Sequence, residues 1–283
     1  MDPDDQGLSR SVEPADCTAV PAVPAVEVVL PVYNEERRLE AGVRGLRAHL
    51  DALDAPVTGS EVRVTIADNG STDRTTAIAR QLADTLPGVD LVRLERKGRG
   101  RALRAVWSGS AAPVVAYMDI DLSTELDAFG PLVAPLLDGS ADLVVGTRLA
   151  PDSQVARSLR REVLSRGYNA LVHLVLRSRV SDAQCGFKAA RREVLGTLLP
   201  VVADDGWFFD TELLVAAERL GLRIREVPVT WVEDGDSTVH LLRTSLLDLQ
   251  GIARLALHPV PRAGSATRTA APTVAAPAGG LSE

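Results

Sequence analysis

Runs rich in Val and Ile alternate with amphipathic helical patterns along the first half of the chain. Short runs of this kind are typical of buried strands, and a helical pattern follows each of them. The strand-like runs lie at 26–32, 61–67, 89–94, 113–118 and 142–147. Repeated strand–helix units with apolar strands favour a mostly parallel sheet that helices cover on both faces. The pattern therefore predicts an α/β fold, in which ligands bind at the carboxyl ends of the strands.

The rhythm changes after the fifth run. Helical patterns lie at about 154–178, 191–199 and 211–221, and a last strand-like run covers 224–231. These segments predict additional C-terminal helices and a short strand region. A final amphipathic stretch, 239–256, carries its leucines on overlapping helical faces. It can pack on the domain or lie in a membrane interface, and the basic residues Arg243 and Arg254 leave the second option open.

The two ends of the chain differ in composition from the part between them. Residues 1–25 are rich in Pro, Asp and Ala, and residues 259–283 are rich in Ala, Pro and Thr without apolar periodicity. We therefore expect a disordered N-terminal tail, one domain at 26–258 and a disordered Ala/Pro-rich C-terminal tail. The acidic N-terminus lacks the order of a secretory signal, and no apolar run reaches the length of about 18 to 20 residues that crosses a bilayer. These observations predict a cytoplasmic protein.

Composition and charge narrow the classes of partner. The chain has 283 residues, of which 46% are hydrophobic and 24% charged, so it can bury a sizeable core. Its net charge of −7 argues against a general nucleic-acid binder. Two cysteines predict neither a disulfide framework nor a four-ligand metal site. The segment 148–192, however, holds ten Arg or Lys against three acidic residues, and it would attract an anion unless it is a solvated helical face.

Polar residues follow four of the predicted strands. These groups are Tyr33–Glu36, Asp68–Asp73, Asp119–Asp121 and Gly146–Arg148. Each has a structural alternative, because Asn34 or Asp73 can cap a helix and Asp-Asn-Gly forms a turn. Since the carboxyl ends of parallel strands meet at one edge, four such groups in succession predict a site there.

Two of these groups have specific chemistry. Asp119 and Asp121 could hold a hard cation such as Mg²⁺ or Mn²⁺, although Asp121 could instead help to begin a helix near Glu125. The basic loop Arg96–Arg101 precedes a helical run from Ala102 and is suited to phosphate. Its spacing is neither that of a P-loop nor that of a dinucleotide fold.

Taken in order, the motifs resemble those of the family 2 glycosyltransferases of GT-A fold, and most of all the dolichyl-phosphate and polyprenyl-phosphate glucosyltransferases. The resemblance covers roughly residues 26–250 and rests on VVLPVYNEE (28–36), ADNGSTDRT (67–75), GRGRALR (98–104), MDIDLST (118–124), VVGTRL (144–149), SDAQCGFKAARRE (181–193), WFFDTELL (207–214) and EVPVTWVEDGDST (226–238). The chain departs from the family in two ways. Arg99 stands where the family usually has lysine, and the membrane segments of many relatives are missing.

The resemblance implies a GT-A type sheet and an inverting transfer of a hexose from a nucleotide diphosphate sugar to a polyprenyl or dolichyl phosphate. UDP-glucose is the preferred donor, with GDP-mannose next. The implied residues fall into three groups: Pro31, Tyr33, Glu35, Asp68, Asn69 and Arg99 for the donor; Asp119 and Asp121 for a Mg²⁺ or Mn²⁺ ion, acting in catalysis with Arg148, Arg161 and Ser165; and Asp182, Gln184, Asp210 and Glu212 for the sugar and acceptor.

An acceptor phosphate needs cations more than a base, because its second pKa near 6 leaves it largely dianionic at neutral pH. Arg161 and Ser165 are four residues apart, so they share a helical face. Asp210 and Glu212 do not share one, so at most one of them points into the site unless the helix begins between them. Trp207 is equally suited to the core and to a ligand contact.

Three alternatives stay open. The acceptor could be soluble, such as a phosphorylated small acid or a growing glycan. The chain could be a non-catalytic module that binds nucleotide sugars. A nucleotidyltransferase would share the sheet and the carboxylate pair, but it should carry a Gly-rich triphosphate loop where this chain has Tyr33–Glu35. If the acceptor is a lipid, we expect peripheral association with the inner face of the membrane.

Overall fold

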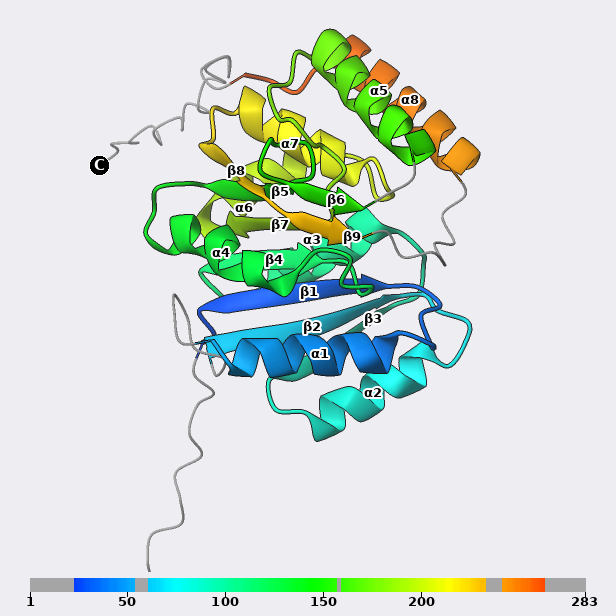
Figure 1. Ribbon diagram of the computed structural model, residues 1–283, viewed down its shortest axis with the longest axis vertical. Helices are drawn as coiled ribbons and strands as arrows, with labels where there is room; N and C mark the ends of the chain where they lie inside the picture. Colours follow the sequence, from blue (N-terminus) through cyan, green and yellow to red (C-terminus); the bar gives the residue numbers. More distant parts are fainter. Residues whose placement is uncertain (1–22, 54–60, 157–158, 233–240, 263–283) are drawn as a thin grey trace, which may run out of the picture.

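The structure is a computed structural model that describes residues 23–53, 61–156, 159–232 and 241–262, with the side chains of 156–161 and 241–245 outside the description. Most of the two predicted tails lies outside these ranges. Figure 1 shows a central sheet with helices on both of its faces and a helix pair at one end.

The main sheet has seven strands in the order β3-β2-β1-β4-β7-β5-β8. Its strands are β1 (Val26–Val32), β2 (Val62–Asn69), β3 (Val89–Leu94), β4 (Val114–Met118), β5 (Leu143–Thr147), β7 (Phe187–Arg191) and β8 (Ile224–Pro228). All neighbours pair in parallel except β7, which runs antiparallel to both β4 and β5. The α/β fold with a mostly parallel sheet is thereby confirmed.

Burial along the strands explains their sequences. Every residue of β4 and β5 is buried, which accounts for their uninterrupted apolar runs. The outermost strands, β3 and β8, have partly exposed positions and accordingly carry charged residues. A second, two-stranded sheet joins β6 (Gln154–Ala156) to β9 (Thr230–Val232).

The helices are α1 (Leu39–Asp51), α2 (Thr75–Thr85), α3 (Arg99–Gly109), α4 (Phe129–Leu137), α5 (Leu159–Leu176), α6 (Arg192–Leu198), α7 (Phe209–Arg219) and α8 (Leu241–Leu257), with short 3₁₀ turns at Leu126–Ala128 and Leu199–Val201. Helices α1 and α2 lie on one face of the sheet and α3 on the other, as right-handed crossovers require (Figure 1). Helices α5 and α8 pack side by side above α7 (Figure 1).

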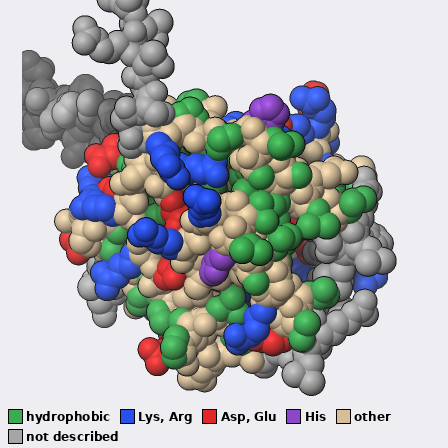
Figure 2. Space-filling view, turned by 90° about the horizontal axis from the view of Figure 1, so that it is seen from above, with side chains coloured by type: hydrophobic (Ala, Val, Ile, Leu, Met, Phe, Trp, Pro, Cys, Tyr) green, Lys and Arg blue, Asp and Glu red, His purple; other side chains and the backbone are tan. Residues whose placement is uncertain are grey.

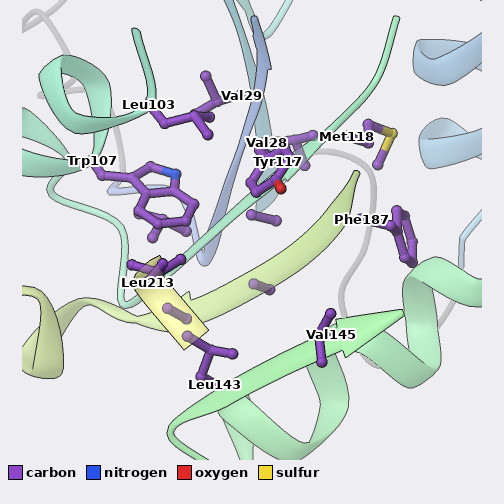
Figure 3. Packing of buried hydrophobic residues seen from close by; sticks show 14 of the residues in the cluster. Val28, Val29, Leu103, Trp107, Tyr117, Met118, Leu143, Val145, Phe187 and Leu213 are labelled. Atoms are coloured by element: carbon purple, nitrogen blue, oxygen red, sulfur yellow. The ribbon is translucent and has the colours of Figure 1, made fainter. Parts of the chain in front are cut away.

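The core lies on both faces of the sheet and includes a cluster of aromatic rings. Trp107 of α3 packs against Tyr117 of β4 with ring centres 5.9 Å apart and against Phe209 of α7 at 6.3 Å. Figure 3 shows Trp107 and Tyr117 on the same side of β4, with Leu213 nearby. This contact fixes α3 and α7 relative to β4, the strand that Asp119 follows.

The structure corrects the sequence pattern in three places. Strand β7 was not predicted, because the buried Lys188 interrupts its apolar run. The predicted run 224–231 is two strands in different sheets, since Pro228 ends β8 and cannot donate a ladder hydrogen bond. The start of the predicted helix 154–178 is instead the short strand β6.

Candidate active site

Hydrogen bonds from two asparagines hold three loops together at the carboxyl edge of the sheet. Asn34 has a left-handed φ of 57°, which asparagine tolerates better than most residues, and its Oδ1 accepts the N–H of Thr72 at 2.8 Å. The amide of Asn69 donates to Val32 O at 2.8 Å and accepts from Gly98 N–H at 3.0 Å. The loops after β1, β2 and β3 therefore form one rigid floor.

The residues predicted for the donor lie on or beneath this floor. Asp68 is fully buried, and its carboxylate accepts hydrogen bonds from Ser71 N–H and Thr76 Oγ1. Tyr33 and Pro31 are partly exposed, and the ammonium group of Lys97 lies 3.6 Å from the centre of the Tyr33 ring. Of this set, Tyr33 and Pro31 are accessible to a ligand, whereas Asp68 and Asn69 are engaged within the protein.

The carboxylates that follow β4 face solvent and Glu35. The side chain of Asp119 is 40% exposed, and Asp121 is exposed and accepts the N–H of Ser123 at 3.0 Å. A small pocket beside them is lined by Leu122, Ser123 and Trp231, among others. Burial raises the pKa of Glu35; Arg38 opposes this, and the charges of Asp121, Asp73 and Asp119 raise the pKa further. Several negative charges therefore share one edge of the sheet.

Arg99 is the cation at the centre of this edge. Its Nη1 donates to Asp119 Oδ1 at 2.6 Å, and its Nε lies 3.3 Å from Asp210 Oδ2. Its guanidinium also lies over the rings of Tyr117 and Trp207, at 5.1 and 4.9 Å from their centres. Burial raises the pKa of Asp119, the Arg99 guanidinium lowers it, and Asp121 raises it again. The arginine that replaces the family's lysine thus reaches the predicted metal carboxylate.

Asp210 links Arg99 to a buried lysine that sequence reasoning missed. Lys188 is fully buried and donates to Asp210 Oδ1 at 3.0 Å, to Tyr117 Oη at 3.2 Å and to Cys185 O at 2.5 Å. Tyr117 also donates to Asp210. A lysine within an apolar strand was the available signal, because a buried ammonium requires partners. Asp210 is thus surrounded by donors.

Arg148 and Asp182 form a second, bidentate ion pair. Arg148 Nε and Nη2 donate to the two oxygens of Asp182 at 2.7 and 2.9 Å. Asp182 is fully buried; burial would raise its pKa, but the Arg148 ion pair lowers it below its ordinary range. The Arg148 side chain stays 13% exposed. It can therefore present its remaining N–H groups to an anion while Asp182 fixes its position.

The remaining predicted residues are divided between the site and the helices above it. Gln184 donates to Asp248 of α8 at 2.9 Å, and Ser165 has a buried Oγ without a hydrogen-bond partner among the described residues. Glu212 accepts two hydrogen bonds from Arg254 of α8, at 2.7 and 2.8 Å, whereas Asp210 is paired with Arg99 and Lys188. That at most one of these two acids points into the site stays a prediction. The side chain of Arg161 lies outside the described residues.

Cys185 lies at the start of the segment that leads into β7 and takes no part in this network through its side chain. Burial raises the pKa of its thiol to about 12, and the charge of Asp182 adds to the effect. A buried thiol with a raised pKa is suited to packing rather than to nucleophilic attack.

The donor set at Asp119 and Asp121 fits a divalent cation that also has ligands from another molecule. Two carboxylates after one strand suit a hard cation such as Mg²⁺ or Mn²⁺. Among the described residues, however, no three His, Cys, Asp or Glu side chains are grouped so as to hold a metal by themselves.

The chain is similar in sequence to a known protein family and to several of its relatives. Residues 27–199 match the family model for glycosyl transferase family 2. Glycosyltransferase AglD of Haloferax volcanii is 38% identical over 243 residues, which are 84% of this chain and 38% of that protein. The dolichyl-phosphate beta-glucosyltransferase of Drosophila melanogaster is 30% identical over 74% of this chain and 67% of its own length. The ALG5C enzyme of Trichomonas vaginalis is 29% identical, and the match covers 65% of it.

Solved structures agree in fold. Glucosyl-3-phosphoglycerate synthase from Mycobacterium tuberculosis, in complex with Mn²⁺, UDP and glucosyl-3-phosphoglycerate, superimposes with a TM-score of 0.61 at 26% identity, covering 85% of this chain and 82% of that one. The mixed sheet is that of a GT-A fold. The match to the Haloferax protein covers well under two thirds of that relative. From the family match and these relatives, we conclude that the chain belongs to glycosyl transferase family 2.

Proposed function

We propose that this chain is the catalytic domain of an inverting glycosyltransferase, which moves a hexose from a nucleotide diphosphate sugar to a polyprenyl or dolichyl phosphate. The observation that carries this proposal is the meeting of Asp119 and Asp121 with two largely buried cations, Arg99 and Arg148, at one edge of the sheet. Such an edge can hold a diphosphate donor and bring an anionic acceptor close to it. The proposed donor is UDP-glucose, and GDP-mannose is the alternative.

The chain's residues would divide the task by charge. Asp119 and Asp121 would hold Mg²⁺ or Mn²⁺, which when bound supplies positive charge to the leaving diphosphate. Tyr33, Pro31 and the Asn34–Asn69 floor would position the nucleoside. Arg148, with Ser165 and Arg161 on one face of α5, would bind the acceptor phosphate.

Transfer to a phosphate needs no protein base. A phosphate oxygen attacks the anomeric carbon with its own electron pair, and the bond from that carbon to the diphosphate breaks with its electrons on the nucleotide. No proton moves, because the acceptor phosphate is largely dianionic at neutral pH. The buried acid Asp210 accepts from Tyr117 and Lys188 and lies next to Arg99, so it is held as a partner for cations.

A lipid acceptor also requires a way to approach a membrane. No helix in the described part of the chain is both long and apolar enough to cross a bilayer. Helices α5 and α8 instead expose leucines and valines on their outer sides, including Leu164, Leu174, Leu246 and Leu257. Figure 2, viewed from above α5 and α8, shows hydrophobic side chains gathered over this end, with Lys and Arg beside them. This face supports peripheral association with the cytoplasmic side of a membrane.

The direct test is transfer of labelled sugar from UDP-glucose, and in parallel from GDP-mannose, to a polyprenyl phosphate in detergent. We expect a lipid-linked sugar that EDTA abolishes and Mn²⁺ restores. Asp119→Asn should lower the rate by about 100-fold or more, the scale of losing one transition-state contact. Asp127→Asn, which removes an exposed acid nearby, should retain the wild-type rate.

A soluble phosphorylated acceptor is the second candidate. It is favoured by the structural similarity to a synthase whose complexes contain phosphoglyceric acid. A parallel reaction with 3-phosphoglycerate distinguishes the two, because only one acceptor should yield a product. Nucleotide-sugar binding without product from any donor or acceptor would instead support a binding module.

A further inference from the structure

Arg99 is paired with Asp119, one of the two carboxylates proposed to hold the metal. It is the first residue of α3, and its side chain is only 9% exposed. Its Nη1 donates to Asp119 Oδ1 at 2.6 Å, a short charge-assisted hydrogen bond. The carboxylate oxygen that a divalent cation needs is therefore already paired with a cation of the protein.

The other oxygen of Asp119 lies against Gly186, while the side chain as a whole is 40% exposed. A Cβ built on Gly186 would lie 1.9 Å from Asp119 Oδ2 and 3.0 Å from Arg99 Nη2, so only glycine fits beside this pair. The backbone also joins the two segments, since Asp119 N–H donates to Gly186 O at 3.2 Å. Asp119 is thus held between Arg99 and the segment that leads into β7, with little freedom to turn toward another ligand.

Arg99 has a second anchor that does not depend on Asp119. Asp210 lies 3.3 Å from its Nε, and Tyr117 and Trp207 flank the guanidinium. Asp210 is itself held by Lys188. The side chain can therefore leave Asp119 without losing all of its partners. A divalent ion on Asp119 would repel the Arg99 guanidinium at short range. A diphosphate, in contrast, would attract both the guanidinium and the divalent ion.

We propose that Arg99 acts as an internal counter-cation that blocks metal binding at Asp119 until a nucleotide diphosphate arrives. The free enzyme then binds metal weakly. Nucleotide and metal bind with strong mutual coupling, because the diphosphate accepts Arg99 and supplies the metal's missing oxygens. This inference rests on the proposed function only for the identity of the metal carboxylates. By reciprocity, metal must tighten nucleotide binding by the same factor.

The test is a Mn²⁺ titration of the full chain followed by electron paramagnetic resonance, in which the free ion signal disappears on binding. The titration is run without UDP and with saturating UDP, against a protein-free UDP reference. Arg99→Gln and Arg99→Met both remove the positive charge but differ in side-chain shape. If one variant does not fold, the other still tests the proposal. Asp119→Asn removes a proposed metal ligand, so the Mn²⁺ binding that this variant loses is the binding at the site. Arg63→Gln removes a surface arginine that pairs with Asp90 outside the site, and it controls for net charge.

Without UDP, the uncharged variants should bind Mn²⁺ about tenfold or more tightly than the wild type, the scale of one charge-assisted hydrogen bond. Adding UDP should therefore raise the Mn²⁺ affinity of these variants by a smaller factor than it raises that of the wild type. Arg99→Lys, which keeps the charge, and Arg63→Gln should stay close to wild type. Equal Mn²⁺ affinity of wild type and both uncharged variants would overturn the proposal, as would a tight UDP-independent site in the wild type.

The titration also separates this inference from the proposed reaction. It uses neither sugar nor acceptor, so a failure to form lipid-linked sugar leaves its result intact. If the wild type and the uncharged Arg99 variants all fail to bind Mn²⁺ even with UDP, the metal assignment at Asp119 is wrong. The proposed blocking role of Arg99 is then wrong as well.

Discussion

Single buried charges determine how the residues of this site are arranged. Lys188 has three acceptors for its three protons, namely Asp210, Tyr117 and the carbonyl of Cys185. A buried ammonium is stable only when it is paired in this way, and removing one partner of such a pair costs about 3–5 kcal/mol. Asp210 is consequently as much a part of the core as of the site.

Asp248 of α8 is a buried acid with less support. Gln184 donates to one of its oxygens, and the other has no hydrogen-bond partner among the described residues. Burial, with repulsion from Asp204 and Asp210, raises its pKa to about 6 against an ordinary value of 3.8. The folded protein therefore holds this proton more tightly than the unfolded chain does, and its stabilising effect is lost as the pH rises through about 6.

We expect Asp248→Asn to stabilise the protein at pH 7.5 by about 1–2 kcal/mol, allowing for solvent screening of the two-unit shift. The gain should shrink toward pH 4.5, where the wild-type carboxyl is protonated. Urea unfolding between pH 4.5 and 8 measures both values, with exposed Asp84→Asn as the control. A gain of equal size at all pH values would show that the ionisation of Asp248 is not its cause.

Close helix contacts position the elements around the site. Every residue of α7 from Phe209 to Ala217 is buried, so this helix has no face toward solvent until its last residues. A Cβ at Gly100 of α3 would lie 2.6 Å from the Cβ of Phe209, and one at Gly251 of α8 would lie 2.4 Å from the Phe208 ring. These two glycines allow α3 and α8 to approach the start of α7, next to Asp210.

Gly251→Ala should therefore destabilise the protein by about 1–3 kcal/mol, because the added methyl group overpacks the contact with Phe208. Gly196→Ala in α6 is the matched control, since its Cβ would meet nothing within 4 Å and helix propensity favours alanine by roughly 0.5–1 kcal/mol. Thermal unfolding of both variants gives the comparison. If the two variants shift the midpoint in the same direction, the α7–α8 contact is looser than its geometry indicates.

The elements that sequence predicted best are those whose signal is local. Strand β1 at Val26–Val32 and strand β3 at Val89–Leu94 have the predicted bounds, because Val and Leu recur along each run and only single charged residues interrupt them. The grouping of polar residues after β1, β2, β4 and β5 followed from the parallel order alone. Strand β7 could not be found in this way, because its lysine is compensated by Asp210 and Tyr117 from distant segments.

The roles of single site residues depended on long-range pairing as well. The sequence identified Arg99 as a cation near a phosphate, but its contact with Asp119 joins residues 20 apart through the fold. Likewise, nothing local distinguishes the buried Asp68 from the accessible Tyr33. Motif order located the edge of the sheet, and tertiary packing decided which side chains reach its surface.

At the scale of the whole molecule, charge and apolar surface are unevenly distributed. The chain carries a net charge of −7, yet the segment 148–192, which includes α5, is strongly basic. Apolar residues of α5 and α8 are exposed at the same end of the molecule (Figure 2). These are the features on which the proposed association with an anionic lipid surface rests.

Leu174→Glu on α5 should reduce co-flotation with vesicles of phosphatidylglycerol and phosphatidylcholine by about tenfold or more, because the leucine is 80% exposed and would be buried in lipid. UDP binding should not change. Leu137→Glu is the control, as that leucine is exposed on another helix, α4. Equal flotation of both variants would argue against α5 as the lipid-facing helix.

The antiparallel strand β7 has a consequence for how the protein is synthesised. Strands β1 to β4 can pair in the order in which they leave the ribosome, whereas β5 has no neighbour in the sheet until β7 and β8 have been made. Until then, the hydrogen-bonding edges of β4 and β5 stay open, and such edges invite pairing with other chains. Because β7 joins β4 to β5 and the glycine before it fits against Asp119, one segment both connects the two parts of the sheet and packs beside this carboxylate. A nascent chain that stops short of residue 191 therefore lacks both.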